Sequence, residues 1–102
     1  MPIYNKLVRD GIPEVIKNEG RGCVVKTIDD REALKLLSEK IIEEANEFSA
    51  KPSMEEMADM LEVLYAIMKK NEWDPAEVER VRLEKVSKRG GFEKNVFLVE
   101  AD

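Results

Sequence analysis

The sequence predicts an all-α helical bundle of three long helices preceded by one short helix. Three observations support this fold class. Apolar residues recur at steps of three and four along two stretches, cap-type residues stand at the ends of the predicted helices, and no apolar run reaches the length of a membrane span. The 102 residues contain no repeat or linker-like tract. Residues 1–102 are therefore expected to form a single domain around one core.

The first predicted element is a short helix near the N-terminus. Asp10 suits the N-cap position because its carboxylate can accept hydrogen bonds from free backbone N–H groups in the first turn. Pro13 stands in that first turn, and Gly20 lies beyond the expected end at Lys17. This helix is expected to continue to Lys17.

Two segments outside the helices resemble β-strands. Residues 23–28 and 95–100 are rich in β-branched side chains and are too short for stable helices. We interpret them as two strands, which can pair as a minor two-stranded β element.

The first long helix is expected over about residues 30–49. Its apolar residues recur at steps of three or four and form one stripe: Leu34, Leu37, Ile41, Ala45 and Phe48. Pro52 then breaks the pattern. Ser53, followed three residues later by Glu56, has the spacing of a capping box and predicts the start of the next helix.

The second and third long helices follow the same logic. The second is expected to bury a stripe of four apolar residues: Met57, Leu61, Leu64 and Met68. Asp74 with Pro75 opens the third helix, which carries Val78, Val81 and Val86 and ends at Gly90-Gly91.

Composition narrows the classes of function. Histidine is absent, which excludes Ser-His and Cys-His nucleophile pairs and every histidine-ligated metal site. The single cysteine, Cys23, cannot form an intramolecular disulfide, and the chain is expected to be cytoplasmic. The net charge of −5 argues against general binding to nucleic acid or to membranes. A chain this small is also expected to gain stability by self-association.

Four carboxylates are expected to face one another across the first two long helices. A tight turn at residues 51–53 makes these helices antiparallel, so residues equidistant from the turn lie at similar heights. Glu47 and Glu56 form one such pair, and Glu44 and Asp59 form the next, one helical turn farther from the loop. This arithmetic predicts two facing pairs of acids.

Small residues at mirrored positions and repulsion between the acids both affect how these four carboxylates can be arranged. Ala45 and Ala58 are related by the same mirror and are expected to let the two backbones approach closely. Glu44 and Asp59 fall beside the apolar stripes, whereas Glu43 points away from its own. Partly buried acids repel one another, and a cation among them would offset this repulsion. Oxygen ligands favour Mg²⁺, with Mn²⁺ as a substitute; the alternative is that these acids form only a solvated face.

These residues resemble a known family. Glu-Glu-x-x-Glu at 43–47, followed by Glu-x-x-Asp at 56–59, is similar to the motifs of the all-α nucleoside triphosphate pyrophosphatase superfamily. That superfamily includes MazG-like proteins and phosphoribosyl-ATP pyrophosphohydrolases. Residues 4–10 (Tyr-Asn-Lys-Leu-Val-Arg-Asp), Ile12-Pro13 and residues 89–92 (Arg-Gly-Gly-Phe) look like the phosphoribosyl-ATP pyrophosphohydrolase-like branch. The resemblance covers most of the chain.

The resemblance implies an Mg²⁺-dependent helical bundle that dimerises and cleaves a nucleotide between its α and β phosphates, releasing a monophosphate and pyrophosphate. Carried over position by position, the implied metal ligands are Glu44, Glu47, Glu56 and Asp59. Glu43 matches the first acid of the motif. Only eight residues separate Glu47 from Glu56, at the short end of the family's spacing, so no preference for a base is transferred.

Catalytic roles follow from the chemistry of the reaction. A carboxylate that is not fully committed to metal can activate the attacking water, and Glu43 or Glu47 suits this role. The resemblance adds three candidates for contacting substrate phosphates: Lys6, Arg9 and Arg89.

Three functions stay open at this point. The first is a nucleoside triphosphate pyrophosphohydrolase acting as a homodimer or homotetramer on a nucleotide substrate. The second is a phosphoribosyl-ATP pyrophosphohydrolase of histidine biosynthesis. The third is a non-enzymatic helical interaction module whose acidic face docks a basic partner.

Overall fold

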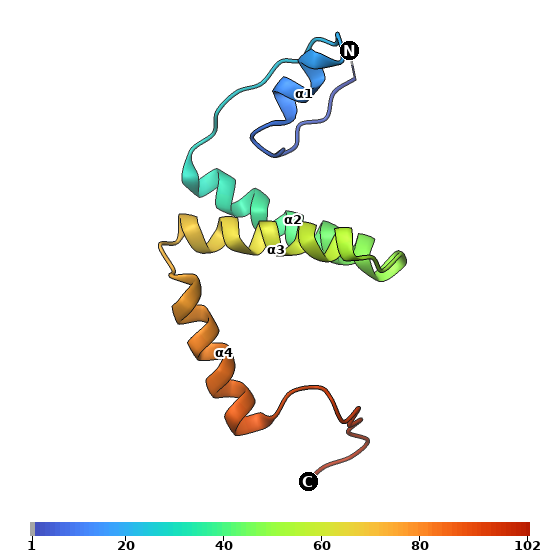
Figure 1. The fold of residues 1–102 in the computed structure, drawn as a ribbon, viewed down its shortest axis with the longest axis vertical. Helices are drawn as coiled ribbons and strands as arrows, with labels where there is room; N and C mark the ends of the chain where they lie inside the picture. Colours follow the sequence, from blue (N-terminus) through green and yellow to red (C-terminus); the bar gives the residue numbers. More distant parts are fainter. Residues whose placement is uncertain (1) are drawn as a thin grey trace.

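The computed structural model describes residues 2–102, and this part of the chain contains four helices. They are α1 (Ile12–Asn18), α2 (Asp30–Ala50), α3 (Met54–Lys70) and α4 (Pro75–Arg89). The predicted all-α class, with three long helices and a short N-terminal one, is confirmed (Figure 1). None of the helices in residues 2–102 combines the length and apolarity needed to cross a membrane.

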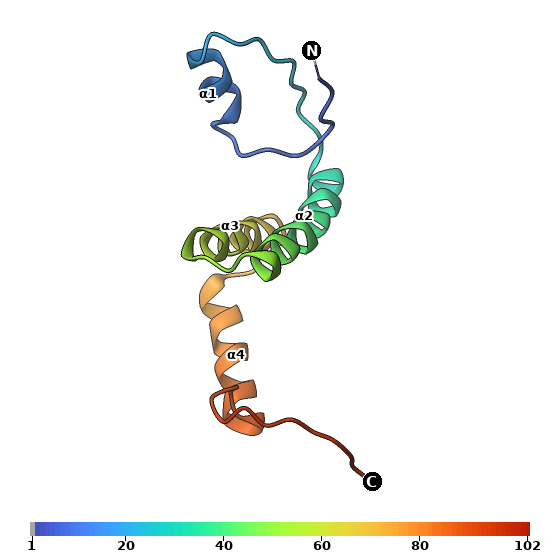
Figure 2. The ribbon, with the colours of Figure 1, turned by 90° about the vertical axis from the view of Figure 1, so that its right-hand side faces the viewer.

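The centre of the fold is an antiparallel hairpin of α2 and α3. The two helices lie side by side in both views, joined by the short turn at residues 51–53 (Figures 1 and 2). Every member of the predicted α2 stripe is buried or half-buried, so this prediction is confirmed. The fully buried apolar residues in the described chain are few: Ala33 and Leu37 from α2, and Val63 from α3.

Helix caps explain why α3 and α4 begin where they do. The Ser53 hydroxyl accepts a hydrogen bond from the backbone N–H of Glu56 at 3.1 Å, as the capping-box spacing predicts. The Asp74 carboxylate accepts one from the N–H of Ala76 at 2.9 Å. Gly90 ends α4 with a φ of 82°, a conformation that favours glycine. The sequence therefore marks three of these helix ends correctly.

The predicted N-cap of α1 is wrong by one residue. Gly11, not Asp10, occupies this position, and no side chain caps the helix. A backbone turn takes over this role, because the Arg9 carbonyl accepts a hydrogen bond from the N–H of Ile12 at 3.0 Å. Asp10 lies within that turn, one residue too early to cap the helix.

The predicted β element is also wrong. Residues 23–28 link α1 to α2, residues 95–100 follow α4, and neither segment forms a strand. The two segments lie toward opposite ends of the molecule (Figure 1). A strand needs a neighbour to complete its backbone hydrogen bonds, so strand-like composition alone does not produce a sheet here.

The stripe predicted to be buried on α3 is mostly exposed. Met57 and Leu61 are each 44% exposed and Leu64 is 37% exposed, whereas Met68 is half-buried. The helix instead turns Val63 toward α2. The reason is that α3 is apolar over a wide arc, and one neighbouring helix covers only part of it.

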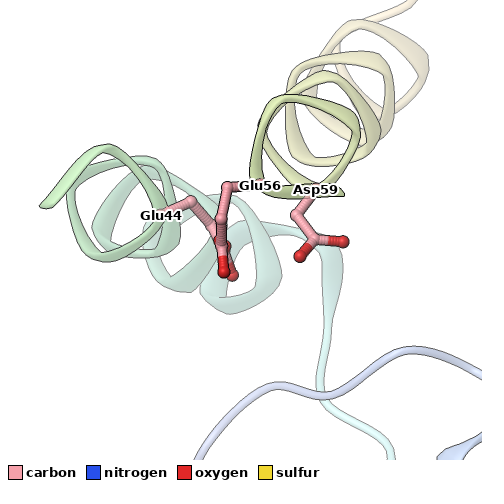
Figure 3. A group of neighbouring side chains, drawn as sticks. All are labelled: Glu44, Glu56 and Asp59. Carbon is pink, nitrogen blue, oxygen red and sulfur yellow. The ribbon is translucent and has the colours of Figure 1, made fainter. Parts of the chain in front are cut away.

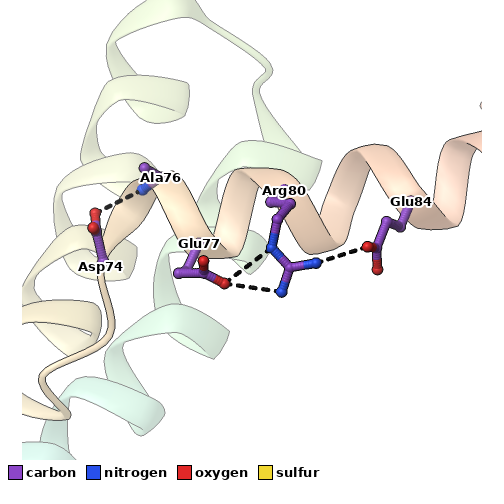
Figure 4. Close-up of polar contacts among 5 residues, drawn as sticks. All are labelled: Asp74, Ala76, Glu77, Arg80 and Glu84. Atoms are coloured by element: carbon purple, nitrogen blue, oxygen red, sulfur yellow. Dashed lines mark hydrogen bonds and ion pairs between the residues drawn. The ribbon is translucent and has the colours of Figure 1, made fainter.

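Helix α4 extends away from the hairpin and buries none of its residues (Figures 1 and 2). Its stabilisation is local. Arg80 bonds with Glu77 at 2.9 Å and with Glu84 at 2.7 Å, one turn to either side (Figure 4). Pairs at these spacings contribute about 0.2–0.5 kcal/mol each. Such pairs support the helix but do not place it against the rest of the chain.

Candidate functional site

Three carboxylates converge between the helices of the hairpin. Glu44 comes from α2, whereas Glu56 and Asp59 come from α3 (Figure 3). One oxygen from each lies within 4.8 Å of the others. The mirror relation about the turn explains this meeting, because the antiparallel helices bring positions 44 and 59 to the same height. We call these three residues the acidic triad.

Glu44 is the most buried member of the acidic triad, at 8% exposed. Its Oε1 lies 3.9 Å from the Lys40 ammonium one turn earlier on α2. Its Oε2 is buried and accepts no hydrogen bond from the described residues, and the same is true of Oε2 of Glu56. Lys40 is not among the site residues predicted from the sequence, although its i,i+4 spacing from Glu44 could have revealed it.

Burial and mutual repulsion both act on these acids. Burial raises the pKa of the Glu44 carboxyl, the negative charge of Glu47 raises this pKa further, and Lys40 opposes the change. Removal from water also raises the pKa of Glu56, and the charges of Glu47 and Asp59 add to it. Both shifts mean that burial and repulsion between the acids outweigh the positive charge nearby.

The other two predicted acids lie beside the acidic triad. Glu47 is exposed and lies outside the group of oxygens within 4.8 Å, but it is close enough to raise the pKa of Glu56. Glu43 is exposed and lies 3.6 Å from the Lys6 ammonium. The predicted close-approach role of Ala58 is wrong, since Ala58 is exposed on α3.

The N-terminal segment crosses the acidic side of the hairpin. Lys6 pairs with Glu43, and the Arg9 guanidinium donates a hydrogen bond to Asp59 Oδ1 at 2.6 Å. Two of the three predicted phosphate-contacting residues therefore lie next to the acids. Arg89 does not, because it stands at the far end of α4 (Figure 1). Within one chain, the structure does not bring Arg89 to this site.

The donor set of the acidic triad suits a hard divalent cation. All its ligand atoms are carboxylate oxygens, which Mg²⁺ and Mn²⁺ prefer. Opposite ligands of Mg²⁺ lie about 4.2 Å apart, so small side-chain rotations would bring oxygens within 4.8 Å into range. Two buried oxygens, Oε2 of Glu44 and Oε2 of Glu56, accept no hydrogen bond from the described residues. They are independent evidence that the site suits a cation, because a cation could coordinate both.

The hollow nearest the acidic side of the hairpin is small. A hollow of about 100 Å³ lies between the N-terminal segment and α2, with Lys6, Lys40 and Glu43 among its walls. Ligand sites usually enclose about 300–1,000 Å³. A larger hollow of about 600 Å³ lies at the corner between α3 and α4, lined in part by Tyr65 and Trp73.

The raised pKa values predict how pH changes stability. A carboxyl whose pKa is higher in the folded state contributes most below its unfolded pKa, and this contribution is lost as pH rises through the folded value. Without metal, Glu44→Gln should therefore be more stable than wild type near pH 7, and this difference in stability should shrink as pH falls to about 4. Thermal unfolding followed by circular dichroism measures this difference. Glu62→Gln is the control, and a similar pH trend there would contradict the assignment.

Comparison of the chain with models of protein families, with curated proteins and with solved structures gives no match.

Proposed function

We propose that this protein is an Mg²⁺-dependent nucleotide pyrophosphohydrolase that cleaves a nucleoside triphosphate between its α and β phosphates. The observation that carries this proposal is the pair of buried carboxylate oxygens, on Glu44 and Glu56, that accept no hydrogen bond from the described residues. Burying such groups is costly unless a cation compensates them. The proposed metal ligands are the acidic triad, with Glu47 available as a fourth ligand.

The bound cation would neutralise charge on phosphate oxygens and lower the pKa of a water molecule. Glu47 is the better candidate to take the proton from that water, because Glu43 is already paired with Lys6. The water oxygen bonds to the α phosphorus, and the bond to the bridging oxygen breaks. Pyrophosphate leaves with the bonding electrons. The products are a nucleoside monophosphate and pyrophosphate.

Positive side chains next to the acids support a polyphosphate substrate. Lys6 and Arg9 lie on the acidic side of the hairpin, where they can turn from carboxylates to substrate phosphates. Arg9 suits this role because its planar guanidinium binds phosphate through two parallel hydrogen bonds. The proposed enzyme acts as a homodimer or homotetramer.

A second function has one observation in its favour. The acidic side of the hairpin already accepts two basic side chains from an irregular segment, Lys6 on Glu43 and Arg9 on Asp59. An interaction module that docks a basic peptide would use the same contacts. This function needs no divalent cation, which distinguishes it from hydrolysis.

One experiment tests the proposal against its alternatives. Titration calorimetry with Mg²⁺, with and without a non-hydrolysable triphosphate, should show uptake of the cation by the wild-type chain. Pyrophosphate release is then measured on ordinary and modified triphosphates and on phosphoribosyl-ATP. Asp59→Asn should remove activity, and the control Glu62→Gln, one turn along α3, should retain it. Turnover of phosphoribosyl-ATP alone would identify the biosynthetic enzyme, and absence of Mg²⁺ uptake would refute the hydrolase.

A further inference from the structure

The N-terminal segment, which we define as residues 2–10, is attached to the hairpin chiefly by charge. Its ion pairs to the hairpin among the described residues are Lys6 with Glu43 at 3.6 Å and Arg9 with Asp59 at 2.6 Å. Leu7 is half-buried, and every other residue of the segment is exposed. Helix α1, which follows the segment, buries none of its residues. Apolar packing therefore contributes little to the attachment of this part of the chain.

The contact between the N-terminal segment and α2 is not fully packed. The hollow of about 100 Å³ lies between them, with Leu7 and Leu36 among its walls. A void of this kind deprives the side chains around it of van der Waals contacts. The side chains of both ion pairs are also about half-exposed, so water and salt weaken their attraction. A ligand that binds the same carboxylates can therefore reverse the attachment.

Arg9 compensates only one member of the acidic triad. Its guanidinium donates a hydrogen bond to Asp59 Oδ1, and the faint blue ribbon of the segment passes close to the acids in Figure 3. The buried Oε2 atoms of Glu44 and Glu56 accept no hydrogen bond from the described residues. A divalent cation in place of Arg9 would compensate all three acids, which favours the exchange.

We propose that the N-terminal segment is a cation-dependent latch. Arg9 holds the segment on the acidic triad in the metal-free chain, and binding of a divalent cation releases it. The inference deepens the proposed function and rests on its metal site. The cation and the guanidinium are both positive and need the same Asp59 carboxylate, so each binds more weakly when the other is present. The released Arg9 is free to bind a phosphate group, so the cation is expected to bind before the nucleotide.

The strength of this competition gives the populations of the attached and released states. Where attachment of Arg9 excludes the cation, the apparent Mg²⁺ affinity is reduced by the fraction of chains whose segment is already released. A two- to five-fold reduction suits a half-exposed ion pair. It corresponds to attachment in about half to four-fifths of the metal-free molecules. Saturating Mg²⁺ should reduce the attached fraction to near zero.

Nuclear magnetic resonance tests the release on the full, unlabelled-side-chain protein. Mg²⁺ should lower the ¹⁵N heteronuclear Overhauser effect of the amides of residues 4–8, because a released segment moves faster on the nanosecond timescale. The Arg9 Nε–H resonance should move toward its position in free arginine. Sodium chloride at the same ionic strength is the control for screening. An equal release by sodium chloride would overturn the proposal.

Arg9→Gln removes the contact on which the latch depends. The segment of this variant should be mobile without metal, and Mg²⁺ should add little further change. Lys6→Gln is the matched control, because the partner of Lys6 is Glu43, which lies outside the acidic triad. Mg²⁺ should still mobilise the segment of Lys6→Gln. A wild-type response to Mg²⁺ in Arg9→Gln would show that Arg9 is not the latch.

Calorimetry on the same samples separates failure of the latch from failure of the proposed function. The expected result is Mg²⁺ uptake accompanied by release of the segment. Uptake of Mg²⁺ with an unchanged segment overturns the latch and leaves the metal site intact. Absence of uptake refutes the metal site, and the latch with it.

Discussion

Glu44→Gln should abolish the stabilisation of the protein by Mg²⁺ and reduce pyrophosphate release roughly a hundred-fold or more. The carboxylate is 8% exposed, and one of its oxygens has no hydrogen-bond partner among the described residues. The substitution preserves shape but removes the charge that would hold a cation. Differential scanning calorimetry, run with and without Mg²⁺, measures the loss of the ligand-induced rise in the unfolding midpoint.

The same variant separates a metal role from a purely structural one. If the charge of Glu44 only destabilises the fold, Glu44→Gln would retain full turnover, together with the higher stability at neutral pH that is expected without metal. Glu62→Gln controls for the loss of one negative charge on the exposed surface of the hairpin. A Glu44→Gln protein with unchanged Mg²⁺ affinity would show that the acidic triad is not the metal site.

Arg9→Gln should have opposite effects on the binding of metal and of substrate. The Arg9 guanidinium is 2.6 Å from Asp59 and competes there with a cation, so its removal should tighten Mg²⁺ binding about two- to five-fold. Both side chains are about half-exposed, which keeps this effect small. Loss of a phosphate-binding group should raise the KM for the nucleotide roughly ten-fold. Calorimetry measures the first effect and steady-state kinetics the second.

A matched control is Arg21→Gln, which removes an exposed arginine paired with Glu19 at 2.7 Å, a partner outside the acidic triad. Neither Mg²⁺ affinity nor KM should change in this variant. If Arg9→Gln behaves in the same way, Arg9 acts only to attach the N-terminal segment to α3.

The hairpin could be predicted from the sequence because its determinants are local. Ser53 and Glu56 define the start of α3 through one hydrogen bond, and Pro52 prevents α2 from continuing. A short turn then fixes which residues of the two helices meet. Simple counting from the turn was therefore enough to place Glu44 beside Asp59.

The remaining features depend on contacts that a periodic pattern does not specify. The spacing of Leu61 and Leu64 predicts a buried stripe but not what covers it, and among residues 2–102 both side chains stay exposed, at 44% and 37%. Residues 23–28 have strand-like composition but lack a neighbouring strand. The resemblance predicts Arg89 at the site, but Arg89 is the last residue of α4, which extends away from the hairpin (Figure 1). Each of these outcomes depends on long-range packing.

The short turn between α2 and α3 also bears on the order of folding. Contacts between residues close in sequence form quickly, since little chain entropy is lost in closing a small loop. The acidic triad and its neighbours Glu43 and Glu47 all lie between positions 43 and 59, so they can come together early, before the terminal segments fold. Association of chains into the proposed homodimer or homotetramer is a bimolecular step, and its rate should rise with protein concentration. Refolding is then expected to show a fast helical phase followed by a slower, concentration-dependent one.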